Sequence, residues 1–308
     1  FEQLWSMGTP IVVQNIHLKG TSQWGPNYFS QRHGAQRVTI INCETGETRV
    51  VSLAQFMGAM GGLHIDGEIW KVKDWPPKED FKDVFPDLDK AFQDDVPFGN
   101  YTRKDGALNF ASYFPINGIF PDLGPKLYIA KATPLNTFGV GSTILHMDVT
   151  SAVNLLIWAA KLDDGSDGYA LWHIFTAEDT LVLRQFLQDE DIYHEAGDPI
   201  HSQSIFLTQE LLEHLDRKRG IQPYAIKQYM GDAVFIPAGC AHQVSNKADA
   251  IKIASDFICA ANLSATVNVS HELRRHRLAN GKESGEDVLQ ITTTLYHAWN
   301  ALEEVRSR

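Results

Sequence analysis

The chain has 308 residues, of which 44% are hydrophobic and 21% charged, a globular balance that excludes disordered and fibrous proteins. Its formal net charge of −11 disfavours a bulk nucleic-acid binder and fits either a basic partner or simple solubility. The length allows one large domain or two small ones, and no apolar run approaches the roughly 20 residues of a membrane span.

The first part of the sequence, to about residue 124, mixes short strands with helices. Trp75-Pro76-Pro77 stops any helix, because proline lacks the backbone N–H and fixes its own φ. The patterns predict strands over 10–16, 37–42 and around 50–51, and a short helix rich in Phe and Asp over 81–92.

From Lys126 the sequence changes to short β-like runs interrupted by one helical insertion, 176–220. The insertion predicts two helices, the second with Thr208 as its N-cap and Gly220 as its stop. A C-terminal helix is predicted over 286–305, where apolar residues recur at helical spacing. Many short strands around helical additions favour a mainly β fold, a sandwich or barrel, over an open parallel sheet. The predicted strands are 127–130, 143–149, 154–160, 171–175, 225–229, 233–236, 242–245 and 251–257.

Three cysteines, Cys43, Cys240 and Cys259, are too few and too scattered for a disulfide framework or a four-cysteine zinc site. They fit a reducing compartment. The chain begins at Phe1 rather than at a methionine, and we expect it to be a domain excised from a longer protein.

One segment, from Gly231 to Asn246, matches the cupin pattern at every fixed position: Gly, five residues, Pro, one, Gly, two, His, three, Asn. In this pattern Gly231 turns one strand into the next, and Pro237 and Gly239 shape a tight corner. The histidine of the pattern, His242, is expected to enter the barrel just after that corner.

A second segment places His146 and Asp148 two residues apart in a predicted strand, so that both side chains point to one face. Together with His242 they form the two-histidine, one-carboxylate set that leaves three coordination positions open and is typical of non-haem Fe(II) oxygenases. The alternative is a buried core histidine with two chance neighbours. A second His-x-Asp, His64 and Asp66, lies among glycines and is interpreted as a turn.

A 2-oxoglutarate oxygenase also needs a cation for the distal carboxylate of its cosubstrate. Lys252, ten residues after His242, has the even offset of an inward-facing strand residue, and Lys161 is the competing candidate. Thr143 offers a hydroxyl to the same carboxylate, and Asn154 an amide to the metal surroundings. A solvated lysine, a ladder threonine and a strand-edge asparagine remain the alternatives.

The chain resembles the Jumonji-C (JmjC) 2-oxoglutarate oxygenases, and within them the demethylases of mono- and dimethylated lysine 9 of histone H3. The resemblance extends from about Trp5 to Trp299. It is carried by the runs Lys71–Phe81, Tyr101–Asn109, Pro121–Tyr128, His146–Val149, Leu171–Ile174, Asp198–Ser204, Val234–Gly239 and His242–Val244.

This resemblance implies a double-stranded β-helix (jelly-roll, cupin) core of JmjC type. It implies a single catalytic domain over 1–308, with an N-terminal flank 1–124, a core 125–260 holding the insertion 176–220, and a helical flank 261–308. It also implies iron on His146, Asp148 and His242, 2-oxoglutarate near Thr143 and Lys252, and Asn109 as a further residue of the cosubstrate pocket.

The implied activity uses Fe(II), 2-oxoglutarate and O2 to hydroxylate an N-methyl group, which then leaves as formaldehyde. The implied partner is a methylated histone H3 tail in the nucleus, with no sequence-specific nucleic-acid binding and no membrane. Two alternatives stay open: a JmjC protein hydroxylase, and a non-catalytic chromatin-binding scaffold.

Two further features concern the substrate. After Tyr128 the family usually continues Asn-Ala-Tyr, whereas this chain has Ile129-Ala130-Lys131, a departure on the methyl-lysine side of the pocket. The net acidity would attract a basic tail, with an effect that fades with salt. The acidic residues considered for the mouth of the pocket are Asp163, Asp164, Asp167, Glu190 and Asp191.

Overall fold

Two antiparallel sheets form the centre of the computed structural model, which describes residues 1–20, 24–61, 68–133, 141–282 and 289–307. The larger sheet has the strand order β1 (Ile11–Val13), β10 (Ala233–Ile236), β7 (Ser151–Ala159), β12 (Ala250–Phe257), β5 (Lys126–Ala130), β4 (Trp70–Trp75), β2 (Arg37–Asn42) and β3 (Thr48–Ser52). The smaller sheet has the order β6 (Thr143–His146), β11 (His242–Asn246), β8 (Tyr169–Ile174) and β9 (Tyr224–Tyr229).

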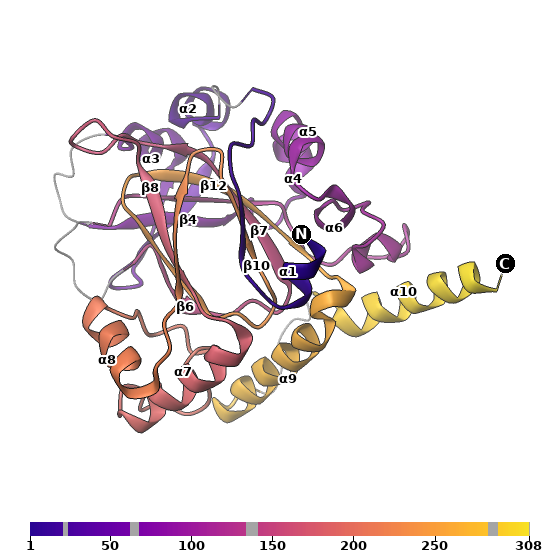
Figure 1. Ribbon diagram of the computed structural model, residues 1–308. Coiled ribbons are helices and arrows are strands. Elements are labelled where there is room, and N and C mark those ends of the chain that lie inside the picture. Colours follow the sequence, from indigo (N-terminus) through magenta and orange to yellow (C-terminus); the bar gives the residue numbers. More distant parts are fainter. Residues whose placement is uncertain (21–23, 62–67, 134–140, 283–288, 308) are drawn as a thin grey trace.

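Helices surround these sheets in three groups (Figure 1). The N-terminal group is α1 (Glu2–Ser6), α2 (Pro26–His33), α3 (Leu53–Gly58), α4 (Phe81–Val84), α5 (Pro86–Asp95) and α6 (Gly99–Thr102). The insertion supplies α7 (Ala177–Asp189) and α8 (Gln209–Arg219), and the C-terminal group is α9 (Leu263–Ala279) and α10 (Ile291–Arg306). Two short 3-10 turns lie at Phe110–Tyr113 and Ala260–Asn262.

The apolar core has layers on both faces of the larger sheet. Between the sheets, Trp172 and Val244 of the smaller sheet pack against Val234 and Ile236 of the larger one. A separate, larger cluster joins the larger sheet to aromatic side chains of the N-terminal helices. Because β1 to β4 share one sheet with β5, β7, β10 and β12, the N-terminal flank is hydrogen-bonded into the same structure as the core. This continuity supports a single domain, which stays a prediction.

Most predicted strands are present with ends shifted by a few residues, and two predicted elements differ. The helix predicted over 81–92 is divided into α4 and α5 at Phe85, whose φ of −129° and ψ of 60° are not helical. Pro86 explains the break, because it lacks an N–H and disfavours the helical conformation at the residue before it. The strand predicted over 143–149 ends at His146.

The predicted C-terminal helix is α10, which begins at Ile291 and projects away from the body of the molecule (Figure 1). Its first turns are packed, with Ile291 and Ala298 buried. Farther along, Trp299 is 66% exposed, so the predicted apolar face is covered only over its first half. No helix in the described part of the chain is long and apolar enough to span a membrane. All three cysteines are free thiols, as expected.

Candidate active site

Strand pairing brings the two histidines of the predicted metal site together. His146 is the last residue of β6, and His242 is the first residue of β11, and the two residues are direct partners in the antiparallel register. Side chains of directly opposed residues share one face of a sheet. The centres of the two imidazole rings are therefore only 4.2 Å apart.

Asp148 completes the group from outside the strand. Its two carboxylate oxygens lie 3.7 Å from His146 Nε2 and 3.6 Å from His242 Nε2. We expected Asp148 to lie in the same strand as His146 and to share its face. Strand β6 instead ends at His146, and Asp148 reaches the two histidines from the loop that follows. The ligand atoms of the three residues lie within 4.8 Å of one another, close enough to hold one metal ion.

The corner before His242 has the form that its glycine and proline predict. Strand β10 ends at Ile236 and β11 begins at His242, and Gly239 between them has φ +83°, a conformation that favours glycine. A Cβ atom at Gly239 would also approach Ala265 to 3.3 Å, so α9 lies close against this corner. Gly231 likewise has φ +88° in the turn between β9 and β10.

Both imidazoles are oriented by backbone carbonyl groups. His146 Nδ1 lies 2.9 Å from the carbonyl oxygen of Ile144, and His242 Nδ1 lies 3.0 Å from that of Cys240. A carbonyl only accepts, so each Nδ1 carries the proton and each Nε2 is free to bind a metal. Burial, together with the neighbouring His146, lowers the pKa of His242 to about 4, which keeps the ring neutral at pH 7.

A cavity of about 450 Å³ opens beside these three residues, and it is lined by Thr143, Asn154, Trp172 and Lys252 among others. Lys252 is 6% exposed, and its Nζ donates a 2.9 Å hydrogen bond to Asn246 Oδ1. The same nitrogen lies 5.1 Å from the centre of the Trp172 ring. Burial lowers the pKa of Lys252 to about 7.

Lys252 is therefore a buried cation aimed into the cavity, and among the described residues no carboxylate forms an ion pair with it. Lys161, the competing candidate, is 66% exposed and pairs with Asp167 at 2.5 Å. The structure thus brings Lys252, Thr143 and Asn154 to the metal group and leaves Lys161 at the surface.

Asn109 is not brought to this group. It is buried, but its Oδ1 accepts hydrogen bonds from the amides of Ala111 and Ile258, and its Nδ2 donates to the carbonyl of Arg103. All of its polar atoms are used by backbone groups. Asn109 therefore ties the N-terminal flank to the end of β12 and does not line the cavity. The second His-x-Asp, His64 and Asp66, falls outside the described residues.

The cavity also has an acidic wall that was not expected from the sequence, and it lies on the same sheet as Lys252. It includes Asp74, Tyr128 and Asp256, and Tyr128 Oη donates a 2.8 Å hydrogen bond to Asp74 Oδ1. Burial and the charge of Asp148 raise the pKa of Asp256. Asp74, Tyr128 and Asp256 also line an adjoining cavity of about 180 Å³. Strand parity could have identified Asp256, because Lys252, Ala254 and Asp256 alternate along β12 and line the same cavity.

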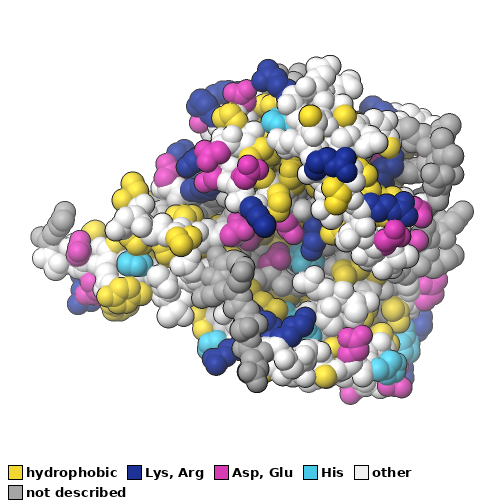
Figure 2. Space-filling model, turned by 180° about the vertical axis from the view of Figure 1, so that it is seen from behind, with side chains coloured by type: hydrophobic (Ala, Val, Ile, Leu, Met, Phe, Trp, Pro, Cys, Tyr) yellow, Lys and Arg dark blue, Asp and Glu magenta, His cyan; other side chains and the backbone are white. Residues whose placement is uncertain are grey.

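The acidic residues considered from the sequence lie elsewhere. None of the five lines the cavity, and several have partners of their own: Asp167 with Lys161, Glu190 with His214, and Asp191 with His194. On the face shown in Figure 2, acidic and basic side chains are mixed, and acidic ones lie beside a histidine near the middle. Acidic side chains therefore do not form one continuous patch on the coloured part of this face, although the net charge of the chain is −11.

Lys131, which replaces the tyrosine usual in the family, points away from the cavity. Its Nζ lies 3.0 Å from Asp249 Oδ2, with both side chains nearly buried, and it also donates to the carbonyl of Ala59. Asp249 in turn accepts from the amides of Ala132 and Gly61. This substitution therefore adds a buried structural ion pair to the segment after β5.

Comparison with known proteins agrees with this geometry. Residues 153–257 match the family described as "JmjC domain, hydroxylase". The human protein named lysine-specific demethylase 3A is 34% identical over 350 residues, covering 97% of this chain and 26% of its own length. The fruit-fly (Drosophila melanogaster) lysine-specific demethylase 3 is 31% identical over 346 residues, covering 97% of this chain and 40% of its own length.

A human protein named probable JmjC domain-containing histone demethylation protein 2C is 29% identical over 343 residues, again covering 97% of this chain but 13% of its own length. The chain thus spans about a quarter of the length of the human demethylase 3A that it matches. The JmjC domain is a cupin-type double-stranded β-helix, which confirms the expected fold class. The family match over residues 153–257 and the similarity over nearly the whole chain show that this chain contains a JmjC domain.

Proposed function

We propose that the chain is an Fe(II)- and 2-oxoglutarate-dependent histone lysine demethylase that acts on mono- and dimethylated lysine 9 of histone H3. The names of the similar proteins support the activity, and the JmjC family supports the use of iron and 2-oxoglutarate. The observation that carries the proposal is Lys252, a buried cation without a carboxylate partner among the described residues, which lines the same cavity as His146 and Asp148.

The donor set fits iron. Two imidazoles and one carboxylate, with ligand atoms within 4.8 Å of one another, would provide three ligands and leave further coordination positions for the reactants. His146 Nε2, His242 Nε2 and Asp148 would hold the ion. When bound, iron supplies, with 2-oxoglutarate and O2, the oxidation that hydroxylates an N-methyl carbon of the substrate, after which formaldehyde is released.

The remaining residues bind and orient the reactants. Lys252, with the Thr143 hydroxyl, receives the distal carboxylate of 2-oxoglutarate, because a dianion compensates the buried ammonium group. The Trp172 ring lies 5.1 Å from Lys252 Nζ and stacks near His242, with ring centres 5.9 Å apart, so it contributes an apolar surface between the two residues. The wall formed by Asp74, Tyr128 and Asp256 receives the methylated ammonium group of the substrate.

The experiment is to incubate the protein with Fe(II), 2-oxoglutarate, ascorbate and histone H3 peptides carrying defined methylation at lysine 9 or at other lysines, and to follow peptide mass. Demethylation predicts loss of whole methyl groups with formation of formaldehyde and succinate. Gain of one oxygen without loss of a methyl group would instead identify a protein hydroxylase. Peptide binding without any turnover of 2-oxoglutarate would identify a non-catalytic scaffold.

Two further statements belong to this proposal. The chain forms one catalytic domain over 1–308, which is supported by the shared sheet of the flank and the core. It acts in the nucleus on chromatin, which is supported by the histone demethylase names of its relatives.

A further inference from the structure

We infer that Thr180 is a positioning residue for the metal ligand His242, acting through the peptide unit that joins Cys240 to Ala241. This inference rests on the metal assignment in the proposed function. It assigns a role to the insertion helix α7, which carries no metal ligand. The argument starts at the imidazole of His242 and ends at the contacts that hold α7.

The peptide unit that joins Cys240 to Ala241 forms hydrogen bonds through both its carbonyl and its N–H. Its carbonyl, from Cys240, accepts a 3.0 Å hydrogen bond from His242 Nδ1. Its N–H, from Ala241, donates a 3.0 Å hydrogen bond to Thr180 Oγ1. A peptide unit is planar, and its N–H and C=O point in opposite directions. Fixing the direction of the N–H therefore fixes the carbonyl that orients the imidazole.

The hydroxyl of Thr180 is itself held in one orientation. It donates a 2.8 Å hydrogen bond to the carbonyl of Thr176, one helical turn earlier, so that a lone pair faces the Ala241 amide. Thr180 is 2% exposed and Ala241 is fully buried, so water is a poor substitute for this contact. Thr176 in turn caps α7, because its Oγ1 accepts from the amide of Asp179 at 3.0 Å.

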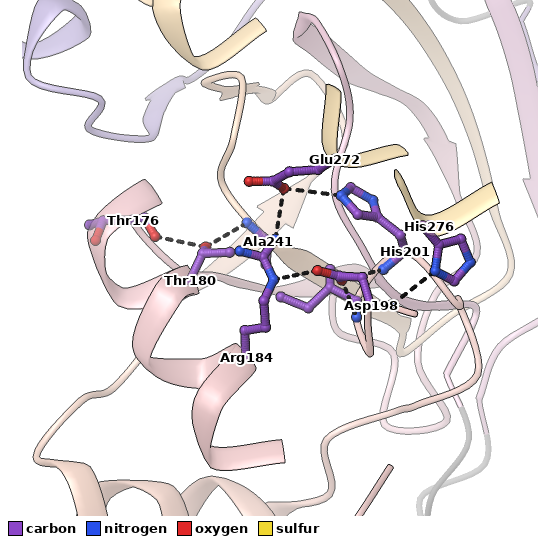
Figure 3. A network of polar contacts seen from close by, with 9 residues as sticks. Thr176, Thr180, Arg184, Asp198, His201, Ala241, Glu272 and His276 are labelled. Atoms are coloured by element: carbon purple, nitrogen blue, oxygen red, sulfur yellow. Dashed lines mark hydrogen bonds and ion pairs between the residues drawn. The ribbon is translucent and has the colours of Figure 1, made fainter. Parts of the chain in front are cut away.

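One turn farther along α7, Arg184 fastens the helix to the rest of the molecule (Figure 3). Its Nε lies 2.5 Å from Asp198 Oδ2, and its Nη2 lies 2.8 Å from Glu272 Oε2 on α9. Asp198, His201 and Glu272 are close enough together to suggest a second metal site. The guanidinium group of Arg184 already pairs with both carboxylates, so this cluster holds α7 in place.

The other metal histidine has a different support. His146 Nδ1 donates to the carbonyl of Ile144, and the N–H of the same peptide unit, from Leu145, donates to the carbonyl of Ile205 at 2.9 Å. The arrangement of the two hydrogen bonds is the same as at His242. The acceptor for the Leu145 N–H, however, is the backbone carbonyl of Ile205, which no side-chain substitution removes. Of the two histidines, only His242 depends on a side chain at this step, which makes Thr180 a selective test.

The test measures metal binding to the apoprotein and needs no turnover. Partners that orient a metal-bound histidine contribute about 10- to 100-fold to metal affinity. Thr180→Val keeps the shape and removes the hydroxyl, and we expect it to weaken Co(II) binding about 10-fold or more and to change the visible absorption of bound Co(II). Thr180→Ser keeps the hydroxyl and should restore both. Thr102→Val is the matched control, because Thr102 is also buried and bonded to a backbone carbonyl, that of Pro97.

A folded Thr180→Val protein that binds Co(II) with wild-type affinity and absorption would overturn the inference. If Thr180→Val does not fold, Co(II) binding is measured with Thr180→Ala instead. A second measurement uses the unmodified protein: nitrogen NMR of His242 should show the proton on Nδ1, and a proton on Nε2 would also overturn the inference. Failure of the unmodified protein to bind Co(II) would instead remove the metal assignment on which the proposed function rests.

Discussion

Lys252 Nζ lies 2.9 Å from Asn246 Oδ1, a contact that joins the larger sheet to the smaller one. The amide is neutral, so it positions the ammonium group without compensating its charge. Desolvation therefore dominates, and it lowers the pKa of Lys252 to about 7. An arrangement of this kind favours an anionic ligand over an empty or water-filled cavity.

Replacement of Lys252 by Met should raise the KM for 2-oxoglutarate about 10- to 100-fold, because a hydrogen bond to a charged group contributes about 1.5–3 kcal/mol. The KM is measured from succinate formation at a fixed concentration of methylated peptide. Lys161→Met is the matched control, since Lys161 is exposed and paired with Asp167. If Lys161→Met raised the KM for 2-oxoglutarate and Lys252→Met did not, Lys161 rather than Lys252 would be the residue that binds the distal carboxylate.

The affinity for 2-oxoglutarate should fall as the pH rises above 7. The free protein loses the Lys252 proton near its pKa of about 7, and the dianion binds the protonated form. Above pH 7 each unit of pH should therefore weaken binding by up to about tenfold, with proton uptake on binding. Calorimetry of the Mn(II)-loaded protein in buffers of different ionisation enthalpy measures both effects. Binding that is independent of pH between 7 and 9 would argue against Lys252.

Replacement of His242 by Ala should abolish metal binding at micromolar concentrations and with it all turnover, because it removes one of three ligands from a site with no spare donor among the described residues. Succinate formation and Co(II) absorption measure the two effects. His214→Ala, which removes a partly exposed histidine bonded to Glu190, is the control. Demethylation by the His242→Ala protein would show that the metal assignment is wrong.

Replacement of Asp256 by Asn should raise the KM for a methylated peptide about tenfold and leave the KM for 2-oxoglutarate unchanged. The reason is that Asp256 shares the acidic wall with Asp74 and Tyr128, where a bound cationic side chain gains from a carboxylate and favours its ionised form. Steady-state kinetics with the peptide varied measure the effect. Asp163→Asn is the control, because it removes the same charge at a residue outside the cavity. If both variants raised the KM for the peptide equally, the peptide would be attracted only by the overall charge of the protein.

Replacement of Lys131 by Met should destabilise the protein without changing its substrate preference. Breaking a buried ion pair removes the cation that faces the buried Asp249 carboxylate and costs about 3–5 kcal/mol. Urea unfolding measures the free energy, and peptide kinetics measure the preference among methylation states. Lys90→Met, in the exposed pair with Asp94, should leave stability near the wild-type value. A stable Lys131→Met protein with altered preference would place Lys131 in the substrate pocket.

The sequence predicted those parts of the site that depend on local geometry. Gly231, Pro237 and Gly239 encode a turn and a corner whose form is determined within a few residues, and His242 follows from them. The even offset from His242 also predicted an inward side chain for Lys252, although the two residues lie on strands of different sheets. Asp148 lies beside His146 and His242 although it is outside the strand predicted for it, because the end of β6 depends on pairing with β11, about a hundred residues away.

Other features required the tertiary structure. The resemblance implied that Asn109 lines the cosubstrate pocket, but its amide forms hydrogen bonds with backbone groups, including one of a distant segment, Ile258. The acidic loop residues, such as Asp163 and Glu190, could not be placed relative to the cavity from the chain order alone. The hydrogen bond from Ala241 to Thr180, which supports His242, joins residues 61 apart in the sequence. The pattern of the insertion predicts its two helices but not this contact.

The cavity walls come from both sheets, and residues such as Asp74, Tyr128, His146 and Lys252 reach it from widely separated parts of the chain. A ligand held between them contacts all of these segments at once and has no equivalent partner in the unfolded chain. By mass action, a metal-bound cosubstrate at 100 times its Kd would add about 2.7 kcal/mol to the free energy of unfolding. Under the proposed function, the fraction of folded protein would therefore rise with the supply of iron and 2-oxoglutarate.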